Sequence, residues 1–340
     1  MGHVIACASL VGCAGSVVPP SERAASTSAS TVDVDAVERV SAADLGERLT
    51  VITVPDPREP DLGNSLDSLA VSDDAVWVTS HRGGILSRID PSTNEVVAVV
   101  ESRILPDCRV NACVGLGGVD VRDGEVWLHN PYLQQFLRID TESNEVVDQV
   151  SDIGRGGFIP GSSLMWAAGP GGGAMGRDFD SGDLTVTVHH NGEIEPAGVA
   201  AGSAWFTTSA CDDLLRVDLA TGSVRATIPA GGCVRSVVDV GGEVWASTFR
   251  GILRIDPAKN QILGSISAST DNDRLSLVVV GDSVWFRTRV TEIVRIDAAS
   301  GQPMERIGLP PGQYQAEIGG GHGSVWIANW AEGTVYRIEN

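Results

Sequence analysis

The chain has 340 residues, of which 42% are hydrophobic, and this is enough apolar surface to bury a large core within one domain. Its formal net charge of −20 disfavours contact with a phosphate backbone and therefore argues against nucleic acid as a partner. The 40 glycines favour many short strands joined by tight turns over a helical fold.

The first residues are typical of a targeting segment. Apart from His3, residues 1–12 are apolar or small, and Leu10-Val11-Gly12-Cys13 resembles a bacterial lipobox, whose Cys is acylated in lipoproteins. We therefore expect a lipoprotein-type signal segment over residues 1–13, lipidation at Cys13 and a secreted or lipid-anchored location on the extracytoplasmic side of the membrane. The apolar run is short and no Lys or Arg precedes it, so a disordered N-terminus with an incidental Cys stays open. No later stretch predicts a membrane-spanning helix.

Residues 14–46 lack both the helical and the strand period. They are rich in Ser, Ala, Thr and Val, and they contain Pro19-Pro20. This composition predicts a disordered, flexible tether between the membrane and a folded domain over residues 47–340.

A tryptophan recurs about every 40 residues through the rest of the chain. The series is Trp77, Trp127, Trp166, Trp205, Trp245, Trp285 and Trp326. The first interval is longer because it contains the loop Cys108-Arg-Val-Asn-Ala-Cys113, which we interpret as an insertion.

Each repeat continues with Arg-Ile-Asp or a relative of it, such as Arg88-Ile89-Asp90, then a turn and an alternating strand. The third repeat is degenerate, with Arg177-Asp178-Phe179-Asp180 in this place. Four short strands in about 40 residues, with regular turn signals, are typical of one propeller blade. The sequence therefore predicts an all-β protein, a seven-bladed β-propeller with four-stranded antiparallel blades.

The tryptophans have a structural explanation. Adjacent twisted sheets leave a wedge between them, and a buried Trp fills it at a gain of roughly 4–6 kcal/mol per ring as an upper bound. A ring of ligand-stacking tryptophans is the functional alternative, but a periodic aromatic at one strand register favours core. The repeated arginines are structural by the same reasoning.

The two ends of the domain complement one another. The last repeat stops after its third strand, and residues 49–54 alternate like the outer strands of the other repeats. We therefore expect this N-terminal strand to pair with the last blade and close the ring, which removes an open edge.

The succession of Val-Trp, Arg-Ile-Asp-Pro and a Val-rich strand resembles the YVTN-repeat family, and it is similar to the propellers grouped with virginiamycin B lyase. The resemblance covers about residues 48–340 and is specific for the fold. It implies, as one possible activity, the Mg²⁺-dependent C–O bond elimination of that lyase. The His and Glu of the lyase site match no motif here, so the resemblance carries over no catalytic residue.

Four cysteines lie in the predicted domain. We expect two disulfides, Cys108–Cys113 and Cys211–Cys233, which agrees with an exported location. A metal site is the alternative, although no His or second Cys-x-x-Cys accompanies them.

One face of the ring carries the loops between the second and third strands and the linkers that enter each inner strand. Aromatic, amide and arginine residues outside the repeat register fall in these loops, and such residues are enriched at binding hot spots. The candidate ligand-binding residues are Arg82, Asn130, Tyr132, Arg155, Arg235, Phe249, Arg250, Arg274, Arg289, Tyr314 and Trp330. They suit a glycan, a peptide or an anionic small molecule. The alternative is that they pair with acidic residues of the same face.

Catalysis has weaker support. His81 or His129 with Glu317 could act as base and acid on that face. Residues 178–183 resemble a calcium loop without its terminal Glu. We therefore predict a binding or scaffold protein without a cofactor; Mg²⁺ or Ca²⁺ enters only if the protein is a lyase.

Overall fold

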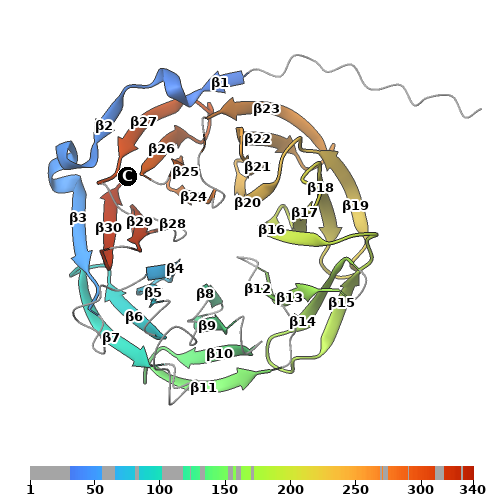
Figure 1. The fold of residues 1–340 in the computed structure, drawn as a ribbon, viewed down its shortest axis with the longest axis horizontal. Helices are drawn as coiled ribbons and strands as arrows, with labels where there is room; N and C mark the ends of the chain where they lie inside the picture. The colour runs from blue at the N-terminus through green and yellow to red at the C-terminus, as the bar shows by residue number, and fades with distance from the viewer. Residues whose placement is uncertain are drawn as a thin grey trace, which may run out of the picture.

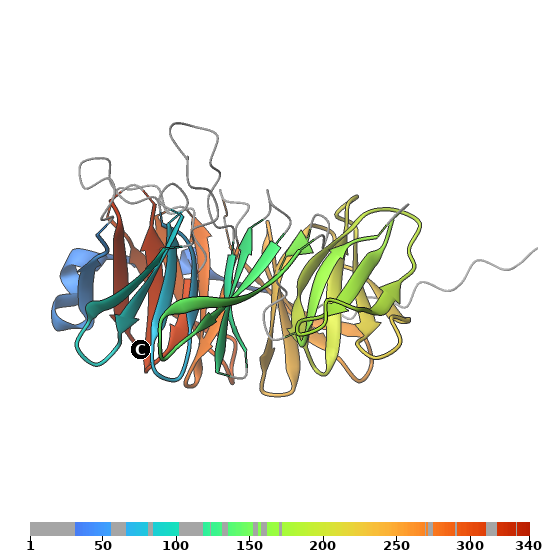
Figure 2. The ribbon, with the colours of Figure 1, turned by 90° about the horizontal axis from the view of Figure 1, so that it is seen from below.

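The computed structural model describes residues 31–55, 66–80, 84–101, 118–122, 124–130, 135–151, 156–157, 162–169, 172–268, 270, 275–289, 291–310, 318–330 and 332–340. Its strands form seven sheets around a central axis (Figure 1), which confirms the predicted seven-bladed β-propeller. Figure 2 shows the ring from the side, with the strands standing along the axis. We call the face that carries the linkers between successive blades the top face.

Each blade has four antiparallel strands that follow one another from the axis outward, except that the outer strand of blade 7 comes from the N-terminal end of the domain. Blade 1 comprises β4 (Leu66–Val71), β5 (Val76–Ser80), β6 (Ile85–Asp90) and β7 (Glu95–Glu101); blade 2 comprises β8 (Gly118–Arg122), β9 (Glu125–Asn130), β10 (Gln135–Asp140) and β11 (Glu145–Val150). Blade 3 comprises β12 (Gly156–Gly157), β13 (Leu164–Ala168), β14 (Ala174–Asp178) and β15 (Leu184–Val188); blade 4 comprises β16 (Ile194–Ala200), β17 (Ser203–Thr208), β18 (Asp213–Asp218) and β19 (Val224–Pro229). Blade 5 comprises β20 (Val234–Val240), β21 (Glu243–Thr248), β22 (Gly251–Asp256) and β23 (Gln261–Ser267); blade 6 comprises β24 (Leu277–Val280), β25 (Ser283–Arg289), β26 (Glu292–Asp297) and β27 (Pro303–Gly308). Blade 7 comprises β28 (Ile318–Gly321), β29 (Ser324–Asn329), β30 (Thr334–Glu339) and β3 (Leu49–Thr53).

The seven periodic tryptophans are core residues, as predicted. Each lies in the second strand of its blade and is at most 2% exposed. In six blades the cross-strand partner of the Trp is the repeat Arg of the third strand. In five of these the guanidinium lies over the indole, from 4.9 Å in Arg337–Trp326 to 5.9 Å in Arg295–Trp285. The Trp–Arg pair is therefore the repeated unit of the core.

Three of these arginines also join neighbouring blades. Arg216 of blade 4 donates to Asn260 in the turn between β22 and β23, at 3.0 Å. Arg88 of blade 1 donates to the carbonyl of Thr141 in blade 2, at 2.6 Å. Arg337 of blade 7 donates to Asn94 of blade 1, at 2.8 Å, so the last and first blades meet through the same contact.

The repeat Asp shapes the turn that follows the third strand. In blade 4 the Asp218 carboxylate accepts hydrogen bonds from Thr221 Oγ1 at 2.9 Å and from the Thr221 N–H at 2.7 Å. These bonds to the charged form lower the pKa of Asp218 to about 2. Asp178, in the segment that resembles a calcium loop, accepts from Ser181 in the same way, so it serves as the repeat Asp of blade 3.

Blade 3 departs from the pattern. Trp166 faces Gly176 across the sheet, and the repeat Arg177 faces Met165 instead. A Cβ on Gly176 would come within 3.2 Å of the Trp166 ring, so the glycine makes room for the indole. The repeat Asp of this blade is nevertheless in place at its turn, which explains why the degenerate motif still forms a blade.

The ring closes as the sequence predicts. The N-terminal strand β3 pairs antiparallel with β30, the third strand of blade 7. Ile52 of β3 lies opposite Val335 and is 4% exposed, whereas its neighbour Val51 is 52% exposed. The outer edge of the last blade is therefore supplied from the other end of the domain.

The predicted tether over residues 14–46 is wrong for residues 31–46. Two short strands, β1 (Thr31–Asp33) and β2 (Arg39–Ser41), add in parallel to the outer strands β23 and β27. Two 3₁₀ segments, η1 (Val34–Ala36) and η2 (Ala42–Arg48), follow them. We call residues 31–48 the strap, which crosses blades 5 and 6 on the outside of the ring (Figure 1).

Buried contacts explain why the strap is ordered despite its polar composition. Val34 and Ala42 are each 1% exposed and pack into the seams between blades 5 and 6 and between blades 6 and 7. The carboxylate of Glu292, itself buried, pairs with Arg39 of the strap at 3.2 Å. These contacts depend on residues far away in sequence, which a composition argument does not detect.

Replacing Ile52 by Ala tests the closure. We expect the free energy of unfolding to fall by about 2–4 kcal/mol, because a buried side chain of the closing strand is lost. Val51→Ala on the same strand is the matched control and should cost less than about 0.5 kcal/mol. Urea unfolding monitored by tryptophan fluorescence measures both; equal losses in the two variants would contradict the closure.

The Asp218 turn predicts an acid-dependent stability. Its folded-state pKa of about 2 lies below the unfolded value, so the stabilisation is present above about pH 4 and is lost as the pH falls towards 2. In Asp218→Asn the free energy of unfolding should therefore fall less steeply between about pH 4 and pH 2, as measured by urea unfolding at successive pH values. Asp73→Asn, which changes an exposed carboxylate outside these turns, serves as control; an identical profile in wild type and Asp218→Asn would contradict the prediction.

Candidate functional site

A cavity of about 270 Å³ lies among the inner strands β4, β8, β16, β20, β24 and β28. Most of its lining is aliphatic or glycine. The charged lining residues are Asp120 and Arg235, and Ser236 and Ser276 add hydroxyl groups. A small cavity that combines aliphatic side chains with a few charged and hydroxyl groups offers a ligand both apolar contact and polar anchors.

Asp120 belongs to an ion pair in the wall of this cavity. Its carboxylate lies 2.7 Å from Arg122, whose guanidinium stacks on the Phe179 ring at 4.2 Å. Burial raises the pKa of Asp120. The pair packs against the side chain of Phe179 in blade 3, so it contributes to the joint between blades 2 and 3 as well as to the cavity wall.

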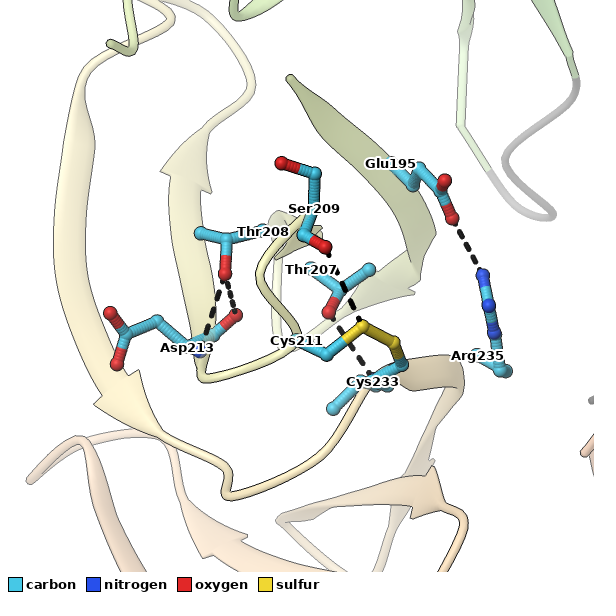
Figure 3. The surroundings of a disulfide bond; sticks show 9 residues. Glu195, Thr207, Thr208, Ser209, Cys211, Asp213, Cys233 and Arg235 are labelled. Atoms are coloured by element: carbon cyan, nitrogen blue, oxygen red, sulfur yellow. Dashed lines mark hydrogen bonds and ion pairs between the residues drawn. A yellow bond between two sulfur atoms is a disulfide. The ribbon is translucent and has the colours of Figure 1, made fainter. Parts of the chain in front are cut away.

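The second charged lining residue, Arg235, belongs to a cluster on the top face of blades 4 and 5. Its guanidinium pairs with Glu195 at 2.6 Å, as Figure 3 shows. It also lies 5.8 Å from the centre of the Phe249 ring, which is 41% exposed. We call Glu195, Arg235 and Phe249 the top-face cluster. It presents a carboxylate, a guanidinium and an open aromatic face at the edge of the cavity.

A disulfide lies directly beside this cluster. Cys211 in the loop between β17 and β18 is bonded to Cys233, two residues before Arg235, which confirms this predicted pair (Figure 3). The N–H of Val234 donates to Thr207 Oγ1 at 3.3 Å. This is a second contact that fixes the linker between β19 and β20 to blade 4. The disulfide and this bond together position the start of β20, and therefore Arg235, relative to blade 4.

The other described candidates differ in their surroundings. Arg250 is exposed next to Phe249, and its N–H donates to Thr248. Arg289 instead lies 3.7 Å from both Asp35 of the strap and Glu292. The ion-pair alternative considered from the sequence therefore describes Arg289, and it also describes Arg235, which pairs with Glu195.

Two more candidates lie in blades 7 and 2. Trp330 follows β29 at the top of blade 7 and is partly exposed. Asn130 ends β9, and only its backbone is described.

Several predicted residues lie outside the described ranges. They are Cys13, His81, Arg82, Cys108, Cys113, Tyr132, Arg155, Arg274, Tyr314 and Glu317. The binding, catalytic, disulfide and lipidation roles assigned to them stay predictions.

His129 is a core histidine of blade 2. It is 6% exposed, and its ring stacks on Phe136 at 4.8 Å. Burial lowers the pKa of His129 to about 4, so the imidazole is neutral at pH 7. Its surroundings explain a packing role, whereas the acid–base role assigned from the sequence stays a prediction.

The sequence predicted only His81 and His129 on the top face, and two further histidines were missed. His189 and His190 lie in the linker from β15 to β16, on the same face. Gly172 and Gly173 pack closely against this linker, and the Gly173 N–H donates to the carbonyl of Gly192 at 2.9 Å. Counting the alternating Leu184–Val188 segment as the outer strand of blade 3 would have placed the two histidines correctly.

Within the described ranges, no three His, Cys, Asp or Glu side chains are placed so that they could hold a metal ion. In the same part of the chain, no helix has the length and apolar character needed to cross a membrane.

Comparison with known proteins supports the fold and not a specific family. No family model and no curated protein matches the sequence. Among solved structures, a streptogramin B lyase aligns with a TM-score of 0.65 and 15% identity over 86% of this chain and 97% of that chain. A catalytically inactive virginiamycin B lyase from Staphylococcus aureus with quinupristin aligns with a TM-score of 0.60 and 15% identity, over 86% and 99% of the two chains. BamB from Moraxella catarrhalis aligns with a TM-score of 0.53 and 13% identity, over 86% and 98%.

The protein is therefore a seven-bladed β-propeller. More narrowly, its ring has the fold of the streptogramin B lyases, which confirms the resemblance drawn from the repeat at the level of the fold. At these identities the likeness concerns the architecture alone.

Replacing both Cys211 and Cys233 by Ser tests the role of the disulfide. We expect a loss of about 3 kcal/mol in the free energy of unfolding, because the bond closes a loop across a sequence separation of 22 residues. Urea unfolding of the oxidised wild type and of the double variant measures the loss. The Cys211→Ser single variant is the control, because it should show one more free thiol than the wild type when thiols are counted by alkylation. Equal stability of wild type and double variant would contradict the prediction.

Proposed function

We propose that the protein is an exported, lipid-anchored β-propeller that binds a ligand or a partner protein on its top face at the cell envelope. The observation that carries this proposal is the top-face cluster at the edge of the cavity, held by the Cys211–Cys233 disulfide. A covalently braced surface loses less conformational entropy on binding than a free loop does.

The chemistry of the cluster favours an anionic partner with an apolar or ring-shaped part. The Arg235 guanidinium can form paired hydrogen bonds to a carboxylate, sulfate or phosphate, and Glu195 is the group such a ligand would displace. The exposed Phe249 ring offers a surface for a sugar ring or an apolar side chain. Acidic glycans, acidic peptides and small carboxylates are therefore the ligand classes that fit.

The proposed location rests on the N-terminal sequence and on the disulfide. The lipobox-like Leu10-Val11-Gly12-Cys13 would supply a lipid anchor, and the Cys211–Cys233 disulfide suits an oxidising compartment.

A thermal-shift screen tests the proposal. The purified protein is heated with acidic oligosaccharides, acidic peptides and small carboxylates, each with and without Mg²⁺ or Ca²⁺. A ligand present at about a hundred times its Kd should stabilise the wild type by about 3 kcal/mol, and Arg235→Ala should remove most of this effect.

Arg225→Ala, on the outer strand of blade 4, is the matched control and should keep the full response to the ligand. A stabilisation that survives both Arg235→Ala and Phe249→Ala would contradict binding at the cluster. Labelling with radioactive palmitate in a bacterial host tests the anchor separately, with Cys13→Ser as control.

A metal-dependent lyase that breaks a C–O bond by elimination is the second candidate function. It is favoured by the similarity of the whole ring to streptogramin B lyase. The protein is incubated with quinupristin and Mg²⁺. The products are separated by chromatography, and their molecular masses are measured by mass spectrometry. Elimination conserves the total mass, whereas hydrolysis adds one water, so an unchanged substrate peak or a hydrated product would each rule out this lyase activity on quinupristin.

A further inference from the structure

The outer strand of a propeller blade has one edge that no other strand of the four-stranded blade pairs with. Such an edge presents backbone N–H and C=O groups to which another strand can add, and proteins usually protect it with a covering segment, a charge within the strand, a proline or a short length. The protection can be examined blade by blade for the described strands of this ring.

Three blades are protected by the N-terminal segment. On blades 5 and 6 the strap strands β1 and β2 pair with the upper ends of β23 and β27. On blade 7 the outer strand β3 has only five residues, and Pro55 follows it closely.

Blades 2, 3 and 4 carry other protective features. In blade 2, Asp148 places a charge within β11. In blade 3, Gly222 from the next blade packs so closely against the Thr187 carbonyl of β15 that no Cβ would fit. In blade 4, β19 contains Arg225 and ends at Pro229, which has no N–H to donate.

Blade 1 differs from all of these. Its outer strand β7 has seven residues and reads Glu-Val-Val-Ala-Val-Val-Glu, so its charges lie only at the two ends. Val97 and Val99 are 54% and 36% exposed, and among the described residues no strand pairs with its outer edge. It is therefore a long, apolar edge without Pro, Lys or Arg.

The strap shows what such an edge accepts in this protein. Val32 of β1 lies beside Ile266 of β23, which in turn pairs with Ile252, two residues before the repeat Arg254. The equivalent residue of β7 is Val100, which pairs with Leu86, two residues before the repeat Arg88. Val100 and Ile266 are both buried. The edge of β7 therefore offers an added strand the same backbone groups and the same buried neighbour that β23 offers β1.

Charge decides between two possible occupants. If a second copy of this chain paired antiparallel through β7, Glu95 of each copy would face Glu101 of the other, and like charges opposite one another destabilise a sheet. The net charge of −20 on each copy adds to this repulsion. A segment with Lys or Arg at its ends and alternating apolar residues between them would instead complement the edge.

We propose that the outer edge of β7 is a docking site for an extended, basic segment of a partner protein, which adds to blade 1 as β1 and β2 add to blades 5 and 6. The backbone supplies the hydrogen bonds, Val97 and Val99 supply the apolar contact, and the acidic ends of the β7 sequence favour positive charge. This edge lies on the outside of the ring (Figure 1) and does not depend on the top-face cluster.

A pair of synthetic peptides tests this site on the full chain. Both alternate Thr and Val, and one has Arg at both ends whereas the other has Glu. The Arg peptide should bind at least about tenfold more tightly by fluorescence anisotropy and should slow amide hydrogen exchange in residues 95–101. The Val97→Lys variant, which adds a charge within the edge, should bind the Arg peptide about tenfold more weakly, or weaker still.

Val224→Lys, on the protected outer strand β19, is the matched control and should bind the Arg peptide like wild type. If Val97→Lys does not fold, Glu95→Lys replaces it and should narrow the preference for the Arg peptide. Equal binding of the two peptides, absence of binding, or slowed exchange on another outer strand instead of β7 would overturn the proposal. Arg235→Ala should leave the peptide binding unchanged, so this test and the test of the top-face cluster fail independently.

Discussion

The structure depends on the filling of the wedge between adjacent blades. Twisted sheets that stand around an axis diverge towards the rim, and each seam needs a large apolar group at one fixed height. The seven buried tryptophans supply it from the second strand of every blade. In five blades the guanidinium of the repeat Arg covers the indole, so a charged group completes an apolar layer without being buried alone.

The same arginine extends the packing of one blade into a connection between blades. The donors are Arg88, Arg216 and Arg337. Each binds an oxygen in the turn that follows the third strand of the next blade, and the repeat Asp of that blade shapes this turn. The Arg and the Asp of the motif therefore act in different blades: the Asp forms the turn of its own blade, and an Arg from the preceding blade binds that turn. Arg337 repeats this contact across the closure, so the two ends of the domain are joined in the same way as the other blades.

The features that recur with the repeat could be predicted from the sequence. The blade count, the burial of the tryptophans, the closing strand and the Cys211–Cys233 disulfide all follow from positions counted within a period of about 40 residues. The strap could not be predicted in this way. Its strands are three residues long, and the side chains that order them, such as Glu292 and Ile266, lie more than two hundred residues away in the sequence.

The same distinction applies to the candidate site. Off-register residues can be assigned to the top face by counting, but their partners depend on which loops meet. Arg289 meets Asp35 of the strap, whereas Arg235 meets Glu195 and Phe249 beside the cavity. His189 and His190 were missed because the degenerate motif of blade 3 obscured the end of its outer strand.

The strap also has a mechanical consequence for an anchored protein. In the proposed lipid-anchored form, a pull on the chain before Thr31 acts first on β1, at the outer rim of blade 5. The strap passes that load to β27 through β2 and to β30 through β3, and the Arg39–Glu292 and Arg306–Asp35 ion pairs fasten it between these points. The load is thus spread over the outer edges of three blades. The inner strands and the cavity lie away from this path. The top-face cluster is connected to it, because the carbonyl of Phe249 accepts a hydrogen bond from Thr270, three residues after the part of β23 that pairs with β1.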